Sequence, residues 1–213
     1  TVSWGSEMCI RDSIDLKAAA FKDGKMLGKV THKPLYGDLL AGKPFTVNYA
    51  MGWTGDIFGE NDVLGADPTT FGLTNGKRGN NASYTPWSSF AIVEGKDLEF
   101  IVNLDKPTEV SKVIFGSLFN PAMRMLPAGG IAVEVSADGQ QYTQIAEKTL
   151  KHDCPETGRI AFTDSIEFEP AQATFLKVKI KNGGTLRNGV NFEKNNGPEV
   201  IPAELWIDEI EAY

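Results

Sequence analysis

From residue 98 onward the chain is a succession of short runs in which apolar and polar residues alternate. Residues 98–104, 131–136 and 174–180 show the pattern most clearly, and turn-forming stretches such as 137–140 separate the runs. A period of two predicts strands that bury one face and expose the other. Further runs lie at 110–115, 117–119, 142–146, 160–162, 165–168 and 203–211, with Lys106-Pro107 expected to end the first strand. No run of ten residues or more has a helical period, so the sequence predicts an all-β chain folded as an antiparallel β-sandwich.

Residues 14–30 carry the signal of a β-hairpin. Alternation over 13–18 is followed by Asp23-Gly24, a dipeptide that suits the type I′ turn, and apolar residues resume at 26–30. A lone hairpin cannot bury its apolar face in water, so this segment requires partner strands. We therefore expect two units, a partial small β-domain over 1–43 and the sandwich over 44–213. Residues 8–13 look like translated sequencing-adapter sequence, and in that case Cys9 is not native.

Residues 44–95 differ from the rest of the chain. They are rich in Gly, Asn, Asp and Thr, with isolated aromatic residues that include Trp53, Phe58 and Trp87. This composition predicts long loops with aromatic inserts rather than regular elements. Long loops in a compact domain are usually functional or wrap an ion.

Charge and residue counts exclude several classes of function. The net charge is −7 and basic residues are not clustered, which argues against a nucleic-acid partner. No apolar run is long enough to insert into a membrane. The chain has only two histidines and two cysteines, and they lack metal-binding spacing. Neither a transition-metal site nor a Ser-His-Asp triad is therefore expected. Each histidine is expected in a surface loop.

Carboxylates are numerous near the C-terminus but form no catalytic pair. Asp164, Glu167, Glu169, Asp208, Glu209 and Glu211 occupy alternating positions of predicted strands, as on solvated sheet faces. Glycosidases need two carboxyl groups at a set separation in a cleft, and no such pair stands out. We expect that this chain is not an enzyme.

Five short motifs, in order, resemble the discoidin or coagulation-factor C-type family, which includes the family 32 carbohydrate-binding modules of bacterial glycosidases. They cover residues 72–79, 98–104, 133–142, 175–180 and 207–212. The resemblance spans roughly residues 45–213 and implies a discoidin-like jelly roll of the galactose-binding-like type. It also implies a secreted, periplasmic or cell-surface bacterial protein that binds a glycan of the galactose or N-acetylhexosamine type.

Residues 16–25 resemble the end of the small β-domain that follows the catalytic barrel in bacterial β-N-acetylhexosaminidases, family 20 glycoside hydrolases. Together the two resemblances imply a non-catalytic, carbohydrate-binding C-terminal part of such an enzyme. The catalytic domain would lie upstream and act as a partner in cis.

Sugar binding requires an aromatic ring for the apolar face of the sugar and polar groups for its hydroxyls. The candidates in the predicted loops are Trp53, Phe58, Trp87, Phe119, Asn120 and Arg124. For each aromatic residue the competing interpretation is a core position, and Trp206 in the last strand is expected in the core.

The family resemblance also implies a structural calcium ion, with Asn75, Asn80 and Glu209 as candidate ligands because calcium prefers oxygen donors. The alternative is that Asn75-Gly76 is only a turn. Two other functions stay open: a structural sandwich that supports the catalytic domain and binds no glycan, and protein or lipid adhesion through the tips at Phe58 and Met123. An anionic membrane would suit this acidic chain poorly.

Overall fold

The computed structural model describes residues 14–22, 25–35, 37–48, 73–74, 76, 78–79, 81, 95–187 and 200–213. These residues form ten strands and one short 3-10 helix. The strands are β1 (Ile14–Lys22), β2 (Lys25–Leu35), β3 (Phe45–Val47), β4 (Leu98–Phe119), β5 (Gly130–Ser136), β6 (Thr143–Thr149), β7 (Ile160–Lys181), β8 (Thr185–Arg187), β9 (Val200–Pro202) and β10 (Ile207–Ala212), and the helix is η2 (Pro121–Met123). None of the described segments is a helix long and apolar enough to cross a bilayer.

Two unusually long strands organise the fold. β4 and β7 are each 22 residues long and pair antiparallel from Leu98↔Ile180 to Phe119↔Ile160. The expected stop at Lys106-Pro107 is therefore wrong, and the predicted runs on each side are halves of one strand. The register shifts between Asn103 and Thr108, and Asp105 adopts φ 69°, so the strand bends there. Proline is tolerated at such an irregularity because no ladder hydrogen bond is needed from it.

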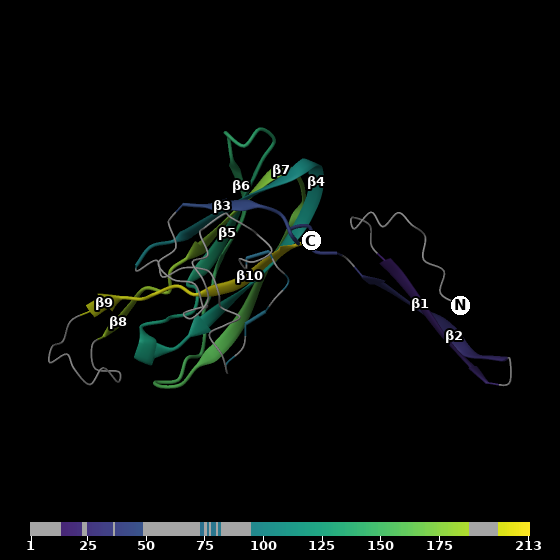
Figure 1. The fold of residues 1–213 in the computed structure, drawn as a ribbon, viewed down its shortest axis with the longest axis horizontal. Helices are drawn as coiled ribbons and strands as arrows, with labels where there is room; N and C mark the ends of the chain where they lie inside the picture. The colour runs from purple at the N-terminus through teal and green to yellow at the C-terminus, as the bar shows by residue number, and fades with distance from the viewer. Residues whose placement is uncertain are drawn as a thin grey trace, which may run out of the picture.

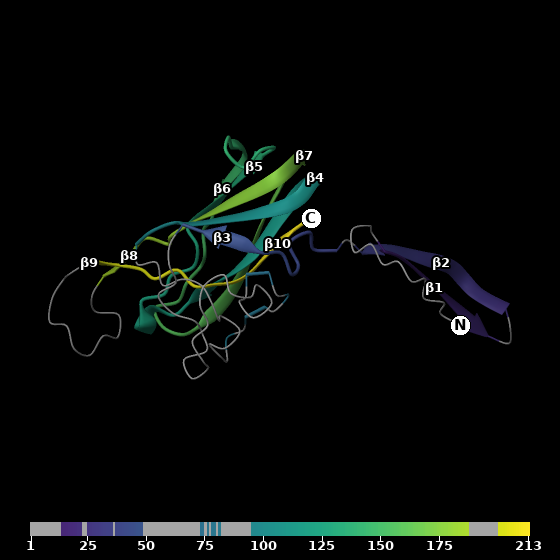
Figure 2. The same cartoon turned by 45° about the horizontal axis from the view of Figure 1, so that its top comes forward.

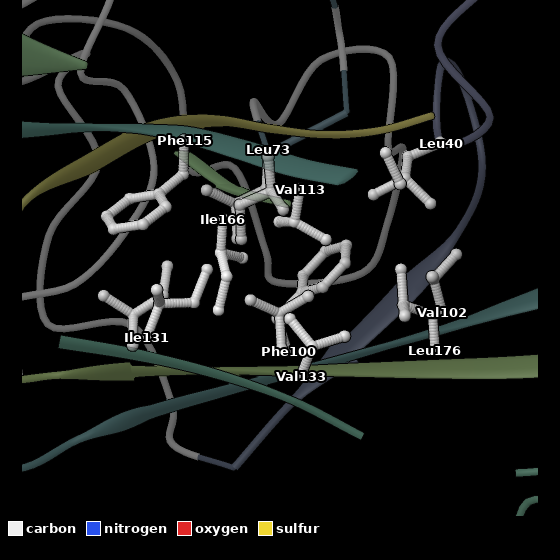
Figure 3. Packing of buried hydrophobic residues seen from close by; sticks show 14 of the residues in the cluster. Leu40, Leu73, Phe100, Val102, Val113, Phe115, Ile131, Val133, Ile166 and Leu176 are labelled. Carbon is white, nitrogen blue, oxygen red and sulfur yellow. The ribbon is translucent and has the colours of Figure 1, made fainter. Parts of the chain in front are cut away.

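The strands form one hydrogen-bonded sheet of order β10-β4-β7-β5-β6, in which β3 also pairs with β4. The bends in β4 and β7 fold this sheet into two layers. The first half of β4 and the last half of β7 join β3, β5 and β6, whereas the other halves join β10. Figure 3 shows the core between the layers, with Phe115, Val113 and Ile166 opposite Phe100 and Val133. The described part of the chain is thus an antiparallel β-sandwich, as the alternation predicts.

The outward face of the first layer is charged, as the alternation of β7 requires. Lys177 and Lys179 point away from the core and pair with the Glu134 carboxylate of β5 at Nζ–O distances of 3.4 and 2.5 Å. The two ammonium groups lower the pKa of Glu134 even though its burial acts in the opposite sense.

The N-terminal hairpin is confirmed, with β1 and β2 paired from Ile14↔Leu35 to Lys22↔Lys25.

The sandwich begins before residue 44. Leu40 is fully buried in the core, and Asp38 accepts hydrogen bonds from the N–H groups of Leu40 and Ala212. The sequence does not predict β3 or the small β8-β9 ribbon. β3 is missed because its three residues lie in a segment whose composition is typical of loops. Figures 1 and 2 place the hairpin on the side of the C-terminus and β8-β9 on the opposite side of the sandwich.

A candidate glycan-binding end and an acidic β-bulge

One end of the sandwich gathers strand termini from both layers. β4 begins and ends there, as does β7, because both strands bend at the other end. The N–H of Ala128 bonds to Ser117 Oγ and that of Leu126 to the Glu204 carbonyl, so the loop after β4 connects the two layers. We call this the open end, and it is built from residues 95–98, 119–130, 149–160, 181–187 and 202–207.

The loop at residues 120–125 is the most tightly built feature of the open end. Asn120 and Met125 exchange backbone hydrogen bonds of 3.0 Å and enclose η2. Arg124 ends the helix in the left-handed conformation, with φ 61° and ψ 21°. A non-glycine residue in this region is uncommon and often marks a functional position. Met123 lies at the tip with 50% of its surface exposed.

Phe119 does not present its ring to a ligand. It is only 2% exposed, because both faces of the end of β4 are covered. The expectation that Phe119 stacks on a sugar is therefore corrected: it is a core residue. Trp206, expected in the core, is 3% exposed and packs with Leu118 and Met125.

Arg124 is held by a chain of polar contacts. Its Nη2 lies 3.3 Å from Glu204 Oε1, and the other carboxylate oxygen of Glu204 accepts a hydrogen bond from Trp206 Nε1 at 3.1 Å. The Arg124 side chain is 38% exposed and that of Glu204 10%. A fixed guanidinium at the surface offers planar N–H donors to the oxygens of a ligand. Asn120 is half-buried on the same loop.

Trp53, Phe58 and Trp87 lie outside the described residues. Asn48 and Gly95 are described residues on the two sides of this part of the chain. The Asn48 side chain bonds to the Asp97 carbonyl and to the Glu99 N–H, and the Gly95 N–H bonds to the Ala203 carbonyl at the open end.

A second polar site lies on β10. The register shifts between Ile207↔Ser117 and Ile210↔Phe115, so Asp208 and Glu209 together face the single residue Gly116. Such a bulge redirects side chains, and here it buries two consecutive carboxylates, which are 3% and 0% exposed. The expected solvated face is therefore wrong at these two positions.

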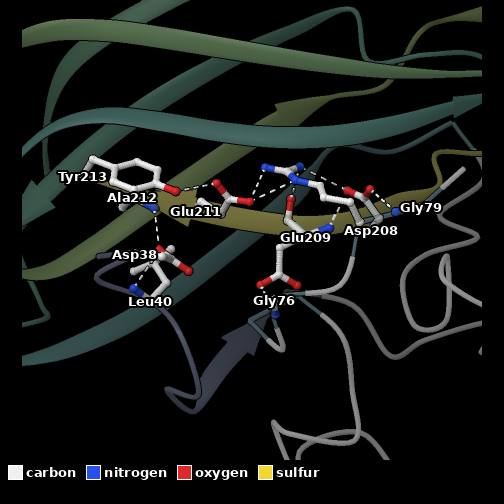
Figure 4. A network of polar contacts seen from close by, with 10 residues as sticks. Asp38, Leu40, Gly76, Gly79, Asp208, Glu209, Glu211, Ala212 and Tyr213 are labelled. Carbon is white, nitrogen blue, oxygen red and sulfur yellow. Dashed lines mark hydrogen bonds and ion pairs between the residues drawn. The ribbon is translucent and has the colours of Figure 1, made fainter. Parts of the chain in front are cut away.

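Three described residues of the 73–81 loop, Gly76, Arg78 and Gly79, bond to this bulge (Figure 4). The Gly76 N–H donates to Glu209 Oε1 at 2.7 Å, and the Gly79 N–H donates to Asp208 Oδ2 at 2.6 Å. Arg78 bonds to the Glu211 carboxylate at 2.7 to 2.9 Å and lies 3.4 Å from Asp208 Oδ1. Burial raises the pKa of Asp208, although the hydrogen bond from Gly79 and the charge of Arg78 act in the opposite sense.

Of the three predicted calcium ligands, Glu209 is described, whereas Asn75 and Asn80 lie outside the described residues. Glu209 is a fully buried carboxylate directed at the 73–81 loop, which is the type of oxygen donor that calcium prefers. In the described part of the chain no three His, Cys, Asp or Glu side chains cluster in a way that could hold a metal ion. A cation here would therefore depend on carbonyl and amide oxygens in addition to Glu209.

One feature of the open end was missed from the sequence. His152, expected in a surface loop, has a side chain only 9% exposed, and its Nε2 lies 3.0 Å from Asp164. The two residues belong to different segments, and neither position has a periodicity or motif that signals the pair. Cys154, two residues on, is a free thiol, whereas Cys9 lies outside the described residues.

No family model matches the chain, and no curated protein matches it. Among solved structures, chitosan-binding module 1 of a chitosanase/glucanase from Paenibacillus sp. IK-5 is 17% identical, with a TM-score of 0.46, over 84% of this chain and 99% of that one. Module 2 of the same enzyme, in complex with chitotriose, is 16% identical, with a TM-score of 0.44, over 83% and 99%. CpGH89CBM32-5 from Clostridium perfringens, in complex with GalNAc-β-1,3-galactose, is 15% identical, with a TM-score of 0.41, over 81% and 95%. The chain is distantly similar to these modules.

Proposed function

We propose that this chain is a non-catalytic, carbohydrate-binding accessory module, the C-terminal part of an exported bacterial β-N-acetylhexosaminidase. Its role is to hold glycan near the upstream catalytic domain and so raise the local substrate concentration. The hexosaminidase parent and the export are inferred from the sequence motifs. Glycan binding is inferred from those motifs together with the geometry of the open end.

The observation that carries the proposal is the fixed guanidinium of Arg124. The left-handed backbone, the Glu204 carboxylate and the Trp206 indole restrict the position of this side chain before a ligand arrives. Preorganised donors lose little conformational entropy on binding, and placed hydrogen bonds discriminate among hydroxyl patterns. Asn120 adds an amide on the same loop, and Trp53, Phe58 and Trp87 are the candidates for a stacking ring.

The direction of the chain suits an accessory module. The polypeptide enters the sandwich at Asp38 and Leu39, which bond to Ala212 near the bent end. The open end lies across the sandwich from that entry. A glycan bound there would be accessible without contact with the segment that connects the module to upstream domains.

We also propose that a calcium ion holds the 73–81 loop against β10, with Glu209, Asn75 and Asn80 among its ligands. Calcium would add positive charge beside the buried Glu209 carboxylate, which already accepts the N–H of Gly76 at Oε1. The ion would have a structural role, because the loop it orders contributes few described core residues besides Leu73.

The test is retention of the intact chain on immobilised galactosides and N-acetylhexosaminides, followed by calorimetry. Arg124→Ala should weaken binding about 10- to 100-fold, the range for loss of charge-assisted hydrogen bonds. Arg124→Lys keeps the charge but not the planar fork, so its affinity should fall between those of the unaltered chain and Arg124→Ala. Lys106→Ala, exposed at the bent end, is the matched control and should bind as the unaltered chain does.

If a broad glycan array retains none of the unaltered protein, glycan binding is wrong. The chain would then be a structural sandwich that supports the catalytic domain. If Arg124→Ala and Lys106→Ala bind a glycan with equal affinity, the binding site does not lie at the 120–125 loop.

A further inference from the structure

A hollow of about 190 Å³ lies at the open end, between the 126–129 loop and the 150–154 segment. Leu126, Pro127 and Leu150 supply apolar walls, and His152 and Cys154 supply polar groups. Sites that enclose a whole drug-sized ligand measure roughly 300–1,000 Å³. This hollow is smaller, so its size fits one substituent of a larger ligand.

The walls of the hollow are held in place by backbone packing. A Cβ atom at Gly183 would lie 2.7 Å from Leu126 Cβ, so only glycine lets the 181–184 segment approach the loop this closely. Gly129 bonds through its N–H to the Lys181 carbonyl and through its carbonyl to the Leu150 N–H. The hollow is therefore lined by segments tied to the sheet.

His152 has a defined orientation in this wall. Its Nε2 lies 3.0 and 3.1 Å from the two oxygens of the Asp164 carboxylate, and its ring packs on Phe162 with 4.5 Å between centroids. A carboxylate only accepts hydrogen bonds, so Nε2 carries a proton. In the tautomer with its single proton on Nε2, Nδ1 is an acceptor. Among the described residues, Nδ1 has no hydrogen-bond partner.

The other polar group in the hollow is uncharged. Burial raises the pKa of the Cys154 thiol, and the neighbouring Asp153 carboxylate raises it further, so the thiol is protonated at neutral pH. A protonated thiol is a weak hydrogen-bond donor. A ligand group that suits the hollow is neutral, with an apolar part, an N–H or O–H donor for Nδ1 and a weak acceptor.

We propose that this hollow binds the acetamido group of an N-acetylhexosamine. The methyl group contacts Leu126, Pro127 and Leu150, and the amide N–H donates to His152 Nδ1. The inference rests on the proposed glycan-binding function and names its substrate class. His152 is a specificity-determining residue, and Asp164 is a positioning residue that fixes its tautomer.

The experiment compares methyl glycosides of N-acetylglucosamine and N-acetylgalactosamine with those of glucose and galactose, by calorimetry on the full chain. The unaltered protein should prefer the N-acetylated sugars by about tenfold, as one well-placed hydrogen bond allows. His152→Ala should reduce that preference to about onefold. Lys151→Ala, an exposed neighbour, is the control and should keep the preference.

A second measurement needs no variant. The chain has only two histidines, so ¹⁵N-labelled histidine gives ring signals from His152 and His32 alone. Adding methyl N-acetylglucosaminide should shift the His152 Nδ1 resonance and leave His32 unmoved. Equal affinities for N-acetylated and plain sugars, with an unmoved His152 signal, would overturn this inference while the glycan-binding function stands. If none of the four sugars binds, the proposed function fails as well.

Discussion

The bulge in β10 leads to a sharp stability prediction at Gly116. A Cβ atom there would lie 2.5 Å from Oδ2 and 2.6 Å from Cγ of Asp208, well inside van der Waals contact. In a Gly116→Ala variant the carboxylate must leave its place, where it accepts N–H groups of Gly79 and Glu209 and faces Arg78. Disrupting a buried, hydrogen-bonded charge of this kind costs about 3–5 kcal/mol.

A part of that cost is offset, because alanine is favoured over glycine within a strand by roughly 0.5–1 kcal/mol. The net loss of unfolding free energy is then about 3 kcal/mol, which lowers Tm by roughly 6–12 °C for a chain of this size. Urea denaturation followed by tryptophan fluorescence measures it, since Trp206 is 3% exposed and close to the bulge.

The control is a double-mutant cycle with Asp208→Ala. Without the carboxylate the space opposite Gly116 is open, so Gly116→Ala should be neutral or stabilising by up to about 1 kcal/mol in that background. The difference between the two backgrounds should be about 3 kcal/mol. An equal loss in both backgrounds would mean that the clash with Asp208 is not the cause, and the reasoning about the bulge would be refuted.

Two further predictions concern the same region. Burial raises the pKa of Asp38, so the folded state binds the carboxyl proton more tightly than the unfolded state does. The free energy of unfolding therefore falls as the pH rises from the unfolded pKa of about 3.8 through the folded pKa. In Asp38→Asn the amide oxygen can still accept from Leu40 and Ala212, and the amide nitrogen takes the buried position of Asp38 Oδ2. Because the amide does not titrate, this part of the pH dependence of the unfolding free energy should be lost in urea titrations of the variant; an unchanged pH dependence would contradict this. Calcium at about 100 times its Kd should raise the unfolding free energy by about 2.7 kcal/mol, and a chelator should reverse this gain. Glu209→Gln should abolish the effect. An unchanged Tm at millimolar calcium would exclude the ion.

The fold assigns different tasks to the two ends of the sandwich. At the bent end, Asp38 ties the incoming chain to the last strand. At the open end, strand termini from both layers bring the loops at 120–130, 149–160 and 181–187 together. The hollow beside His152 is lined in part by residues 126–129, which follow the 120–125 loop in the chain.

Only some of the candidate site was predictable from sequence. Asn120 and Arg124 stand between two apolar runs, and that position predicts a connection at a strand end. Phe119 looks equally loop-like, but its burial depends on which elements cover the end of β4. The pair of His152 and Asp164 has no local signal, because the residues lie in different segments and meet only after β7 is placed.

Local alternation determined the all-β class, the hairpin at the N-terminus and the strands near 98–104, 131–136 and 174–180, because the burial of one strand face is a property of neighbouring residues. Tertiary structure decided where strands continue and what their ends meet. β4 runs through Pro107 because β7 bends with it, and the bulge at Asp208 and Glu209 exists because Gly116 of another strand leaves room. These outcomes depend on contacts between residues far apart in the chain, which periodicity along a single strand does not report.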